Sequence, residues 1–291
     1  MSAARTSFVI ASRNRAAELA TTITRLLNTT CSPIICVDNG SEDDSVAVVR
    51  RFATRSDGRV LAMELKSNRG VMARNVGVAA ARTPNVAFCD DDSWWAPGSV
   101  EKAEAIFDRH PTVGLLAART VVMPQRRDDP MTTELANSVL GRRADLPGPS
   151  ILGFMTCAAI VRRSAFLAAG GFSDLLHFYG EEQLLAVDLA ALGWDLCYCP
   201  ELTAYHQPSA VRGTSSARQA RELRNAVLTT WLRRPMWSCL KATGQLLWAA
   251  ARDGAHARNA AEAFARLPTV ANLRRPLPDD VEHALTLLES S

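Results

Sequence analysis

The sequence has 291 residues, of which 47% are apolar and 22% charged, and its formal net charge is only +3. That composition is typical of a globular protein with one large domain, or with one domain and a smaller appendage. So small an excess of positive charge, without basic runs interleaved with aromatic residues, gives no indication of a nucleic-acid partner.

The cysteines and the apolar runs suggest where the protein works. The seven cysteines are scattered, and none of their spacings completes a zinc site. Cys197 and Cys199 have the spacing of alternate strand positions, which would place both thiols on one face. An odd number of thiols is typical of a reducing cytosol. The first residues do not resemble a signal peptide, and no apolar run reaches the roughly 20 residues of a spanning helix. We therefore expect a cytoplasmic protein, with peripheral contact at the inner face of the membrane as an alternative.

The first part of the chain alternates apolar runs with segments of helical spacing. This alternation predicts an α/β fold, a Rossmann-like, mostly parallel sheet flanked by helices. Strands are expected at residues 7–11, 33–37, 60–65, 86–89 and 113–122, with helices at 16–27, 43–54 and 99–109 and an alanine-rich helix ending near residue 81.

Residues 124–150 interrupt this alternation with four prolines and two pairs of arginines. A loop this long inside a domain is usually functional or disordered, and we expect a lid or an acceptor-contacting insertion with a short helix at 132–140. Beyond it, the pattern predicts a strand at 153–161, helices at 162–169 and 182–192, and strand pieces at 196–199 and 202–205.

After residue 209 the sequence becomes basic and aromatic, with expected helices at 214–233, 237–252 and 255–267 and a loosely ordered tail apart from 281–288. We therefore divide the chain into a catalytic domain at 1–210 and a helical extension at 211–291. The extension would serve as a cap, as a dimer contact, or as an amphipathic surface against an anionic membrane.

The strand expected at 86–89 ends in three consecutive carboxylates, Asp90, Asp91 and Asp92, and Trp94 and Trp95 follow. Adjacent acids repel one another, and a divalent cation completed by substrate phosphates would account for them. The alternative is a polar turn, in which aspartate is common. Either tryptophan could stack on a sugar ring or fill the core.

Other polar residues are expected after neighbouring strands, at the edge where such sheets bind ligands. Arg13 and Asn14 follow the first strand, and Asp38 follows the second. Asp38 is either a turn residue or an acceptor for a nucleobase or ribose. Arg74 is either a solvated helix residue or a diphosphate ligand. No G-x-G-x-x-G follows the first strand, which disfavours NAD and FAD, and the chain has no P-loop.

Five motifs, taken in order, resemble the family-2 glycosyltransferases with a GT-A fold. The resemblance covers roughly residues 6–210. It implies transfer of a sugar from a nucleotide-diphospho-sugar to a sugar, lipid-linked or small-molecule acceptor, with inversion at the anomeric carbon. The motifs are Ser12-Arg13-Asn14, Asp38-Asn39-Gly40-Ser41, Asn68-Arg69-Gly70 with Ala73-Arg74-Asn75-Val76-Gly77, Phe88-Cys89-Asp90-Asp91-Asp92, and Gly180-Glu181-Glu182.

The resemblance also implies roles for individual residues. Asp90 and Asp92 match the family's Asp-x-Asp motif, which holds Mg²⁺ or Mn²⁺ against the diphosphate. His206 is either a further ligand of the metal or diphosphate, or a structural hydrogen-bonding residue. The residues expected to bind the donor are Ser12, Arg13, Asn14, Asp38, Asn68, Arg74, Asp90 and Asp91.

The acceptor hydroxyl needs a base, and Glu181 and Glu182, at an expected helix start, are the candidates. A helix N-terminus favours the charged form of a carboxylate, although acids in a first turn are also common structural residues. The family usually has Glu-Asp here, with the aspartate as base. Glu182 stands in its place, so we expect Glu182 to be the base and leave Glu181 as the alternative.

Two other functions compete with glycosyl transfer. A sugar nucleotidyltransferase would need a glycine-rich basic loop after the first strand, and residues 12–15 lack the glycines. A non-catalytic scaffold subunit would retain the fold for partner contacts, but the presence of both the acid cluster and the glutamate pair argues against it.

Overall fold

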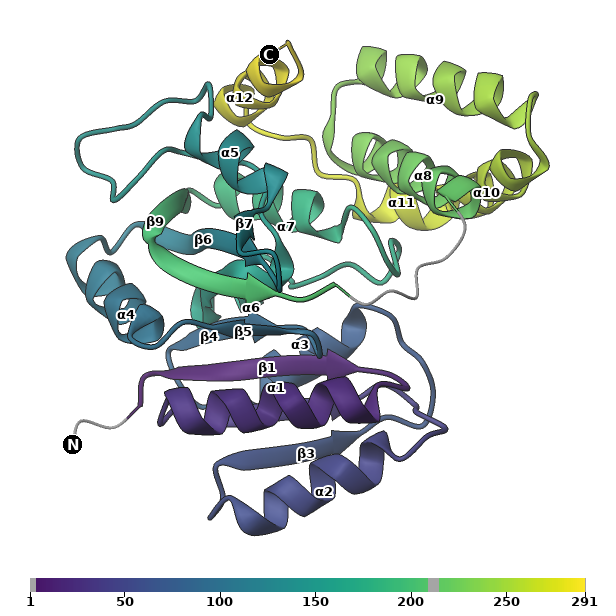
Figure 1. Cartoon of the computed structure of the whole chain (residues 1–291). Helices are drawn as coiled ribbons and strands as arrows, with labels where there is room; N and C mark the ends of the chain where they lie inside the picture. The colour runs from purple at the N-terminus through teal and green to yellow at the C-terminus, as the bar shows by residue number, and fades with distance from the viewer. Residues whose placement is uncertain (1–3, 209–214, 291) are drawn as a thin grey trace.

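A computed structural model describes residues 4–208 and 215–290 (Figure 1). One nine-stranded sheet has the order β3-β2-β1-β4-β8-β6-β9-β5, and β7 pairs with β6 beside this path. The strands are β1 (Thr6–Ser12), β2 (Ile34–Asp38), β3 (Val60–Glu64), β4 (Asn85–Cys89), β5 (Ser93–Trp95), β6 (Val113–Val122), β7 (Arg127–Asp128), β8 (Ala159–Arg162) and β9 (Asp195–His206). The helices are α1 (Ala16–Thr29), α2 (Ser45–Arg55), α3 (Met72–Ala80), α4 (Ser99–Arg109), α5 (Pro130–Ala136), α6 (Arg163–Ala168), α7 (Glu181–Ala191), α8 (Ser215–Arg233), α9 (Met236–Ala250), α10 (Gly254–Ala265), α11 (Leu267–Leu273) and α12 (Asp279–Ser290).

The α/β class is confirmed, and the sheet itself is mixed. Strands β3, β2, β1 and β4 are parallel, as are β6 and β9. The short strand β8 runs antiparallel between β4 and β6, and β5 and β7 are also antiparallel to their partners. Since parallel neighbours share one direction, the carboxyl ends of β1, β2 and β4 meet at the same edge.

Alternating strand residues build a core on each face of the sheet. Phe8 and Ile10 pack on one face with residues of α1 and α4, and Val9 packs on the other with residues of α3 and α7. Cys197 and Cys199 both lie in the first of these clusters, as their spacing predicted. A Cβ added at Gly77 would lie 2.5 Å from the Val9 side chain, so this glycine lets α3 lie close to β1.

Three expectations in the second half of the chain were wrong. Residues 153–158 are not part of a strand, because this buried apolar run ends in a short 3₁₀ turn, Thr156–Ala158, before β8 begins. The strand pieces around Pro200 are one strand, β9, whose pairing with β6 skips residues 200–202. The short helix of the insertion begins at Pro130, after the cap Asp129, and not at residue 132.

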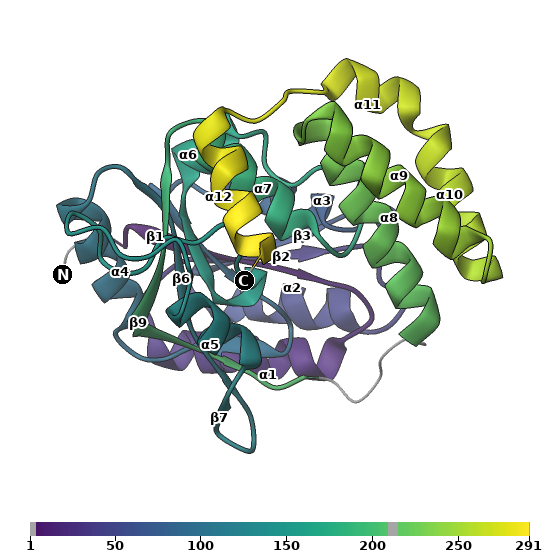
Figure 2. The ribbon, with the colours of Figure 1, turned by 90° about the horizontal axis from the view of Figure 1, so that it is seen from above.

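A third apolar cluster joins the helical extension to α7 and to the loop before it. Figure 2 shows the helices of the extension from above. Helices α8 to α11 pack together, and α12 lies apart from them beside α7. Helix α12 covers residues 281–288, which were expected to be the ordered part of the tail, and α11, which buries Val270 in this cluster, makes the rest of the tail more ordered than expected. Part of the predicted helix at 214–233 lies outside the described residues, because residue 214 is not among them. Within the described part of the chain, no helix is both long and apolar enough to cross a membrane.

Candidate active site

The carboxyl ends of β1, β2 and β4 bring the predicted polar residues together. Ser12 pairs with Asp38 across β1 and β2, and Ile10 pairs with Cys89, which directly precedes Asp90. The hydroxyl of Ser12 donates to Asp91 Oδ2 over 2.7 Å. Residues from three strands therefore meet where open α/β sheets bind ligands.

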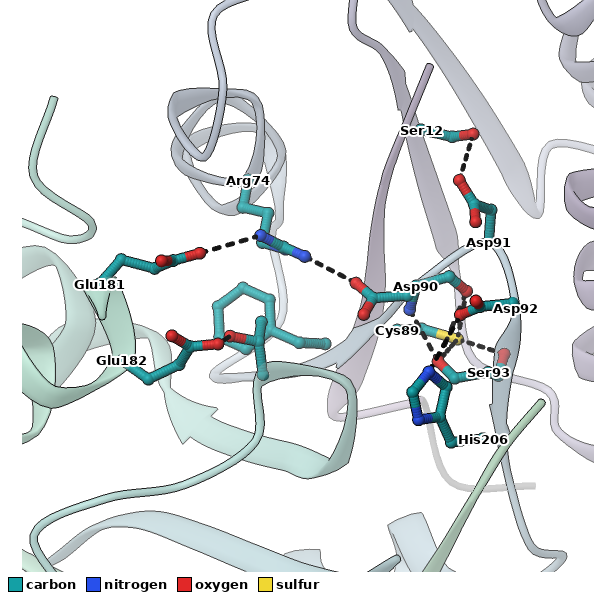
Figure 3. Close-up of polar contacts among 12 residues, drawn as sticks. Ser12, Arg74, Cys89, Asp90, Asp91, Asp92, Ser93, Glu181, Glu182 and His206 are labelled. Carbon is teal, nitrogen blue, oxygen red and sulfur yellow. Dashed lines mark hydrogen bonds and ion pairs between the residues drawn. The ribbon is translucent and has the colours of Figure 1, made fainter. Parts of the chain in front are cut away.

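Arg74 connects this strand edge to the start of α7 (Figure 3). Its Nη2 donates to Asp90 Oδ1 over 2.6 Å, and its Nη1 lies 3.9 Å from Glu181 Oε1. Burial disfavours the charged guanidinium, but Asp90 and Glu181 outweigh it and raise the pKa of Arg74. The structure thus places Arg74 between two carboxylates, in a buried ion-pair network and not in solvent.

The two glutamates at the start of α7 have different environments. Glu181 is buried, and burial together with the charge of Glu182 raises its pKa to about 8, against the opposing effect of Arg74. Glu182 is half-buried, and its Oε1 accepts a hydrogen bond of 2.9 Å from Thr156 Oγ1. Thr156 was not predicted as a site residue, because it lies in an apolar run that resembles a strand.

Asp92 and His206 meet through the pairing of β5 with β9. Ser93, next to Asp92, is in register with His206. As a result, His206 Nε2 lies 3.5 Å from Asp92 Oδ1 (Figure 3). Burial lowers the pKa of His206, but the hydrogen bond and charge of Asp92 raise it further, and the net shift is upward. Asp92 and His206 are therefore brought together, as a metal role would require.

Asp91 points away from this pair toward β1. Besides the bond from Ser12, its backbone carbonyl accepts a hydrogen bond from Thr22 of α1. Burial raises the pKa of Asp91 to about 7, although the Ser12 bond opposes the shift. The three consecutive aspartates therefore have three different partners: Arg74, Ser12 and His206.

Asp38 has one carboxylate oxygen paired and one without a partner. Its Oδ2 accepts from the backbone N–H of Ser41, whereas Oδ1 is buried and has no hydrogen-bond partner in the described part of the chain. A buried carboxylate oxygen normally has a partner, so a ligand donor at this position would satisfy it.

The other predicted donor-binding residues hold the loops around Asp38. Arg13 Nε donates to the Gly40 carbonyl, and Asn14 Oδ1 accepts from the Glu42 N–H. Asn68 Oδ1 accepts from the side chain of Asn39. These contacts fix the loops after β1, β2 and β3 to one another.

The two tryptophans after the acids have different surroundings. Trp95 is buried, and its Nε1 donates to the Phe88 carbonyl, so the stacking role is wrong for this residue. Trp94 stacks on Tyr205 with ring centres 5.5 Å apart, and the Arg25 guanidinium lies 3.6 Å from its ring centre.

Comparison with known proteins identifies the family. Residues 7–168 match the profile described as "Glycosyl transferase family 2", which is more than half of the chain. The chain belongs to this family.

The chain is also similar to individual proteins. It is 35% identical over 138 residues to the pre-mycofactocin glycosyltransferase of Mycobacterium tuberculosis (strain CDC 1551 / Oshkosh), a match that covers 46% of this chain and 29% of that protein. It is 30% identical over 92 residues to the succinoglycan biosynthesis protein ExoU of Rhizobium meliloti (strain 1021), covering 31% and 27% of the two chains. The matches thus span less than a third of the length of these two relatives.

Solved structures show that this family-2 glycosyltransferase has the GT-A fold. The mannosyltransferase PcManGT of Pyrobaculum calidifontis, in complex with GDP-Man and Mn²⁺, superposes with a TM-score of 0.60 at 18% identity, covering 98% of this chain and 86% of that one. Residues 1–349 of S. aureus TarS, in complex with UDP-GlcNAc, superpose with a TM-score of 0.59 at 14% identity, covering 97% and 92%. At these identities the likeness concerns the fold alone, and it confirms the GT-A fold expected from the motifs.

Proposed function

We propose that this family-2 glycosyltransferase transfers a sugar from a nucleotide-diphospho-sugar to an acceptor hydroxyl, with inversion and with the assistance of a divalent cation. One observation carries the proposal. Arg74 contacts both Asp90 and Glu181, and thereby joins the strand-end acids and the glutamate pair, which lie far apart in the sequence, into one site. Solved structures of the same fold hold GDP-Man with Mn²⁺ and UDP-GlcNAc, which supports this class of donor.

The side chains that could act as metal ligands suit a divalent cation that is held largely by the phosphates of the substrate. Among the residues that the structure describes, no three histidine, cysteine, aspartate or glutamate side chains form a ready metal cluster. Mg²⁺ usually binds one or two carboxylates plus substrate phosphates, so Asp92, with Asp90 and His206 beside it, would hold Mg²⁺ or Mn²⁺. The ion would offset the negative charge that develops on the departing nucleoside diphosphate.

The protein's own side chains supply the remaining steps. Asp38 Oδ1 accepts a hydrogen bond from the nucleobase or ribose and thereby orients the donor. Thr156 holds the carboxylate of Glu182 in one orientation. As the acceptor oxygen bonds to the anomeric carbon and the bond to the diphosphate breaks, the acceptor proton passes to Glu182. Arg74 keeps Asp90 in place and contributes positive charge next to the reaction.

We also propose that residues 1–210 form the catalytic domain and residues 211–291 a helical extension. The family match ends at residue 168, but Glu182 and His206 lie beyond it in α7 and β9. Both elements pack into or pair within the main sheet, so they belong with the catalytic part.

Isothermal titration of UDP, GDP and dTDP, with and without Mn²⁺, tests the proposal. We expect metal-dependent binding of at least one nucleotide, weakened in Asp92→Asn. We also expect donor hydrolysis that is lost in Glu182→Gln while nucleotide binding is retained. Absence of binding to all three nucleotides would instead favour a scaffold role, and full transfer by Glu182→Gln to an acceptor would remove the base assignment.

A further inference from the structure

Helix α9 exposes a stripe of large apolar side chains. Five of its residues lie on one side of the helix, as their spacing requires. Two of them are in the first turn, one is a turn later, and two are near the end of the helix. They are 51 to 72% exposed, whereas a soluble surface normally shows such residues singly. We call these residues the α9 face: Met236, Trp237, Leu240, Leu247 and Trp248.

An apolar groove of about 290 Å³ continues the α9 face toward α10 and α11. Leu240 belongs to both, and Phe264 and Leu267 line the groove from the neighbouring helices. Figure 1 shows α9 on the outer side of the helical extension, with α8 between it and the rest of the molecule. The buried residues of α9 are Ser238, Cys239, Ala242 and Leu246, which lie on the side of the helix opposite to the α9 face.

Basic residues outnumber acidic ones on the helices around the α9 face, although Arg224, Arg233 and Arg234 form ion pairs with acids. Residues 215–275 contain eleven Lys and Arg against three Asp and Glu, although the whole chain has an excess of only three. Helix α9 contains no acidic residue, and Lys241 lies exposed within the stripe. The Arg252 guanidinium lies 3.3 Å from the centre of the Trp248 ring, so basic and aromatic groups lie together at the end of the stripe.

We propose that the α9 face docks on a phospholipid surface that carries anionic headgroups. Tryptophan, leucine and methionine would enter the headgroup and acyl boundary, while Lys241 and Arg252 meet lipid phosphates. A second copy of the chain is a poorer occupant, because it would bring Lys241 and Arg252 of both copies together, with no acidic residue of α9 to pair with them. Lipid binding in this form does not depend on the sugar-transfer chemistry.

Flotation of the purified chain with vesicles tests this proposal. We expect it to float with vesicles of phosphatidylcholine and phosphatidylglycerol, and not with phosphatidylcholine alone. Trp237→Ser combined with Leu240→Ser should abolish flotation, and Lys241→Glu should weaken the affinity by at least about fivefold. Leu192→Ser, which changes a leucine 52% exposed at the end of α7, is the matched control and should float like the wild type. No flotation with either lipid, or a solution dimer that the double variant breaks, would overturn the proposal.

A separate observation concerns Asn225 of α8, which is fully buried. Its Nδ2 lies 2.9, 2.7 and 2.6 Å from the carbonyl oxygens of Leu176, Phe178 and Tyr179. Its Oδ1 accepts from Arg224 Nε. The two N–H groups of this one side chain are thus shared among three backbone carbonyls of a single loop, residues 176–180.

That loop leads directly to the glutamate pair and has an unusual backbone. His177 and Tyr179 have backbone φ angles of 59° and 73°, in a region that residues other than glycine rarely adopt. On the side away from α8, the His177 carbonyl accepts from the N–H of Val71. A Cβ at Gly70 would lie 2.5 Å from His177 Nδ1, so only glycine permits this approach. The loop is therefore held between the start of α3 and α8.

We infer that Asn225 is a positioning residue: by fixing residues 176–180 it sets the first turn of α7 and with it the carboxylate of Glu182. This inference rests on the proposed role of Glu182 as the base. Without the amide donors of Asn225, the Phe178 and Tyr179 carbonyls would lose this partner, whereas the Leu176 carbonyl would keep the bonds from the Phe178 N–H and from Arg224 Nη2. The loop and its two residues with positive φ would then be held less firmly. The helical extension would then contribute to the geometry of the reaction without contacting a substrate.

Two substitutions and a matched control test the inference. Asn225→Asp has the same shape but cannot donate to carbonyls, and Asn225→Ala removes the amide without adding charge. Both should lower kcat for donor hydrolysis by about tenfold or more, with nucleotide affinity unchanged. Both should also speed amide hydrogen exchange at residues 176–182. The control, Trp231→Phe, removes the hydrogen bond from Trp231 to Thr243 inside the same helical extension and should leave kcat unchanged.

The outcomes separate the inference from the proposed function. The inference about Asn225 would be overturned by unchanged amide hydrogen exchange at residues 176–182 in both Asn225 variants. An equal loss of kcat in the Trp231 control would also overturn it. If the wild type hydrolyses no donor, the proposed function fails, while the exchange measurement still decides whether Asn225 fixes the loop.

Discussion

Glu181 and Glu182 are consecutive in the sequence but face different partners. Glu181 Oε1 lies 3.9 Å from the Arg74 guanidinium in a buried position, whereas Glu182 Oε1 accepts a hydrogen bond from Thr156 at the half-buried edge of the site. Burial and the charge of Glu182 raise the pKa of Glu181, which favours its neutral form over the charged form that a base needs. We therefore propose Glu182 as the base and a structural role for Glu181.

The two glutamine variants should consequently behave differently at pH 7. Glu181→Gln puts a neutral amide in place of an acid whose neutral form is favoured and should retain most of the transfer or donor-hydrolysis rate. Glu182→Gln removes the proton acceptor and should lower kcat by about a hundredfold or more. Steady-state kinetics with one donor measures both, with nucleotide affinity as the control for folding. Equal losses in the two variants would contradict the division of roles.

The buried carboxyl of Glu181 also predicts how stability depends on pH. Its pKa lies near 4.5 in the unfolded chain and is raised to about 8 in the folded state, mainly by burial. The folded state therefore binds this proton more tightly, so the stabilisation is complete below pH 4.5 and is lost as the pH rises through about 8. We expect the melting temperature to fall between pH 6 and pH 9, and to fall less in Glu181→Gln. Glu134→Gln, an exposed glutamate of α5, should keep the wild-type slope. If the melting temperature depended on pH identically in all three proteins, the raised pKa of Glu181 would be refuted.

Arg74 should contribute strongly to stability. Its side chain is 8% exposed and forms the only link that we identify between Asp90 and Glu181 among the described residues. Removing Arg74 leaves the Asp90 carboxylate without its charged partner, and Asp90 is 29% exposed, so Arg74→Met should lower the free energy of unfolding by about 1.5–3 kcal/mol, as for loss of a hydrogen bond to a charged group. Chemical denaturation gives the value.

The control for this prediction is Arg50→Met, which breaks an exposed ion pair with Glu64. Exposed pairs contribute about 0–1 kcal/mol, so this variant should unfold almost like the wild type. A small effect of Arg74→Met, comparable with that of the exposed pair, would show that Asp90 and Glu181 do not depend on the guanidinium.

The sequence was sufficient to place the polar groups at strand ends. Apolar runs followed by Asp38 or Asp90 predict a strand and the loop after it, and parallel neighbours bring these loops to one edge. The same local patterns do not reveal which partner a side chain will choose. Arg74 was expected to meet a diphosphate or solvent, but its contact with Glu181 depends on where the later helix α7 begins.

Contacts that depend on distant segments could not be predicted in the same way. Thr156 lies in an apolar run that resembles a strand, and its hydrogen bond to Glu182 follows from the 3₁₀ turn that replaces that strand. Asn225 lies in a basic helix without a motif, and its three carbonyl partners are in a loop before α7. His206 was recognised as a candidate, but its approach to Asp92 depends on the register of β5 with β9.

Asp38 offers a direct test of donor recognition, because one of its buried carboxylate oxygens has no partner among the described residues. Asp38→Asn retains an oxygen for the Ser41 N–H but can present an amide donor where the carboxylate would accept. If a nucleobase or ribose group donates there, nucleoside diphosphate affinity should fall by about ten- to a hundredfold, as for loss of a hydrogen bond to a charged group. Asp43→Asn is the matched control, since this exposed aspartate caps the neighbouring turn through Ser45 and should leave the affinity unchanged. Titration calorimetry in the presence of Mn²⁺ compares the three proteins. Equal affinities would mean that Asp38 only shapes the turn after β2 and that the donor is oriented by other groups.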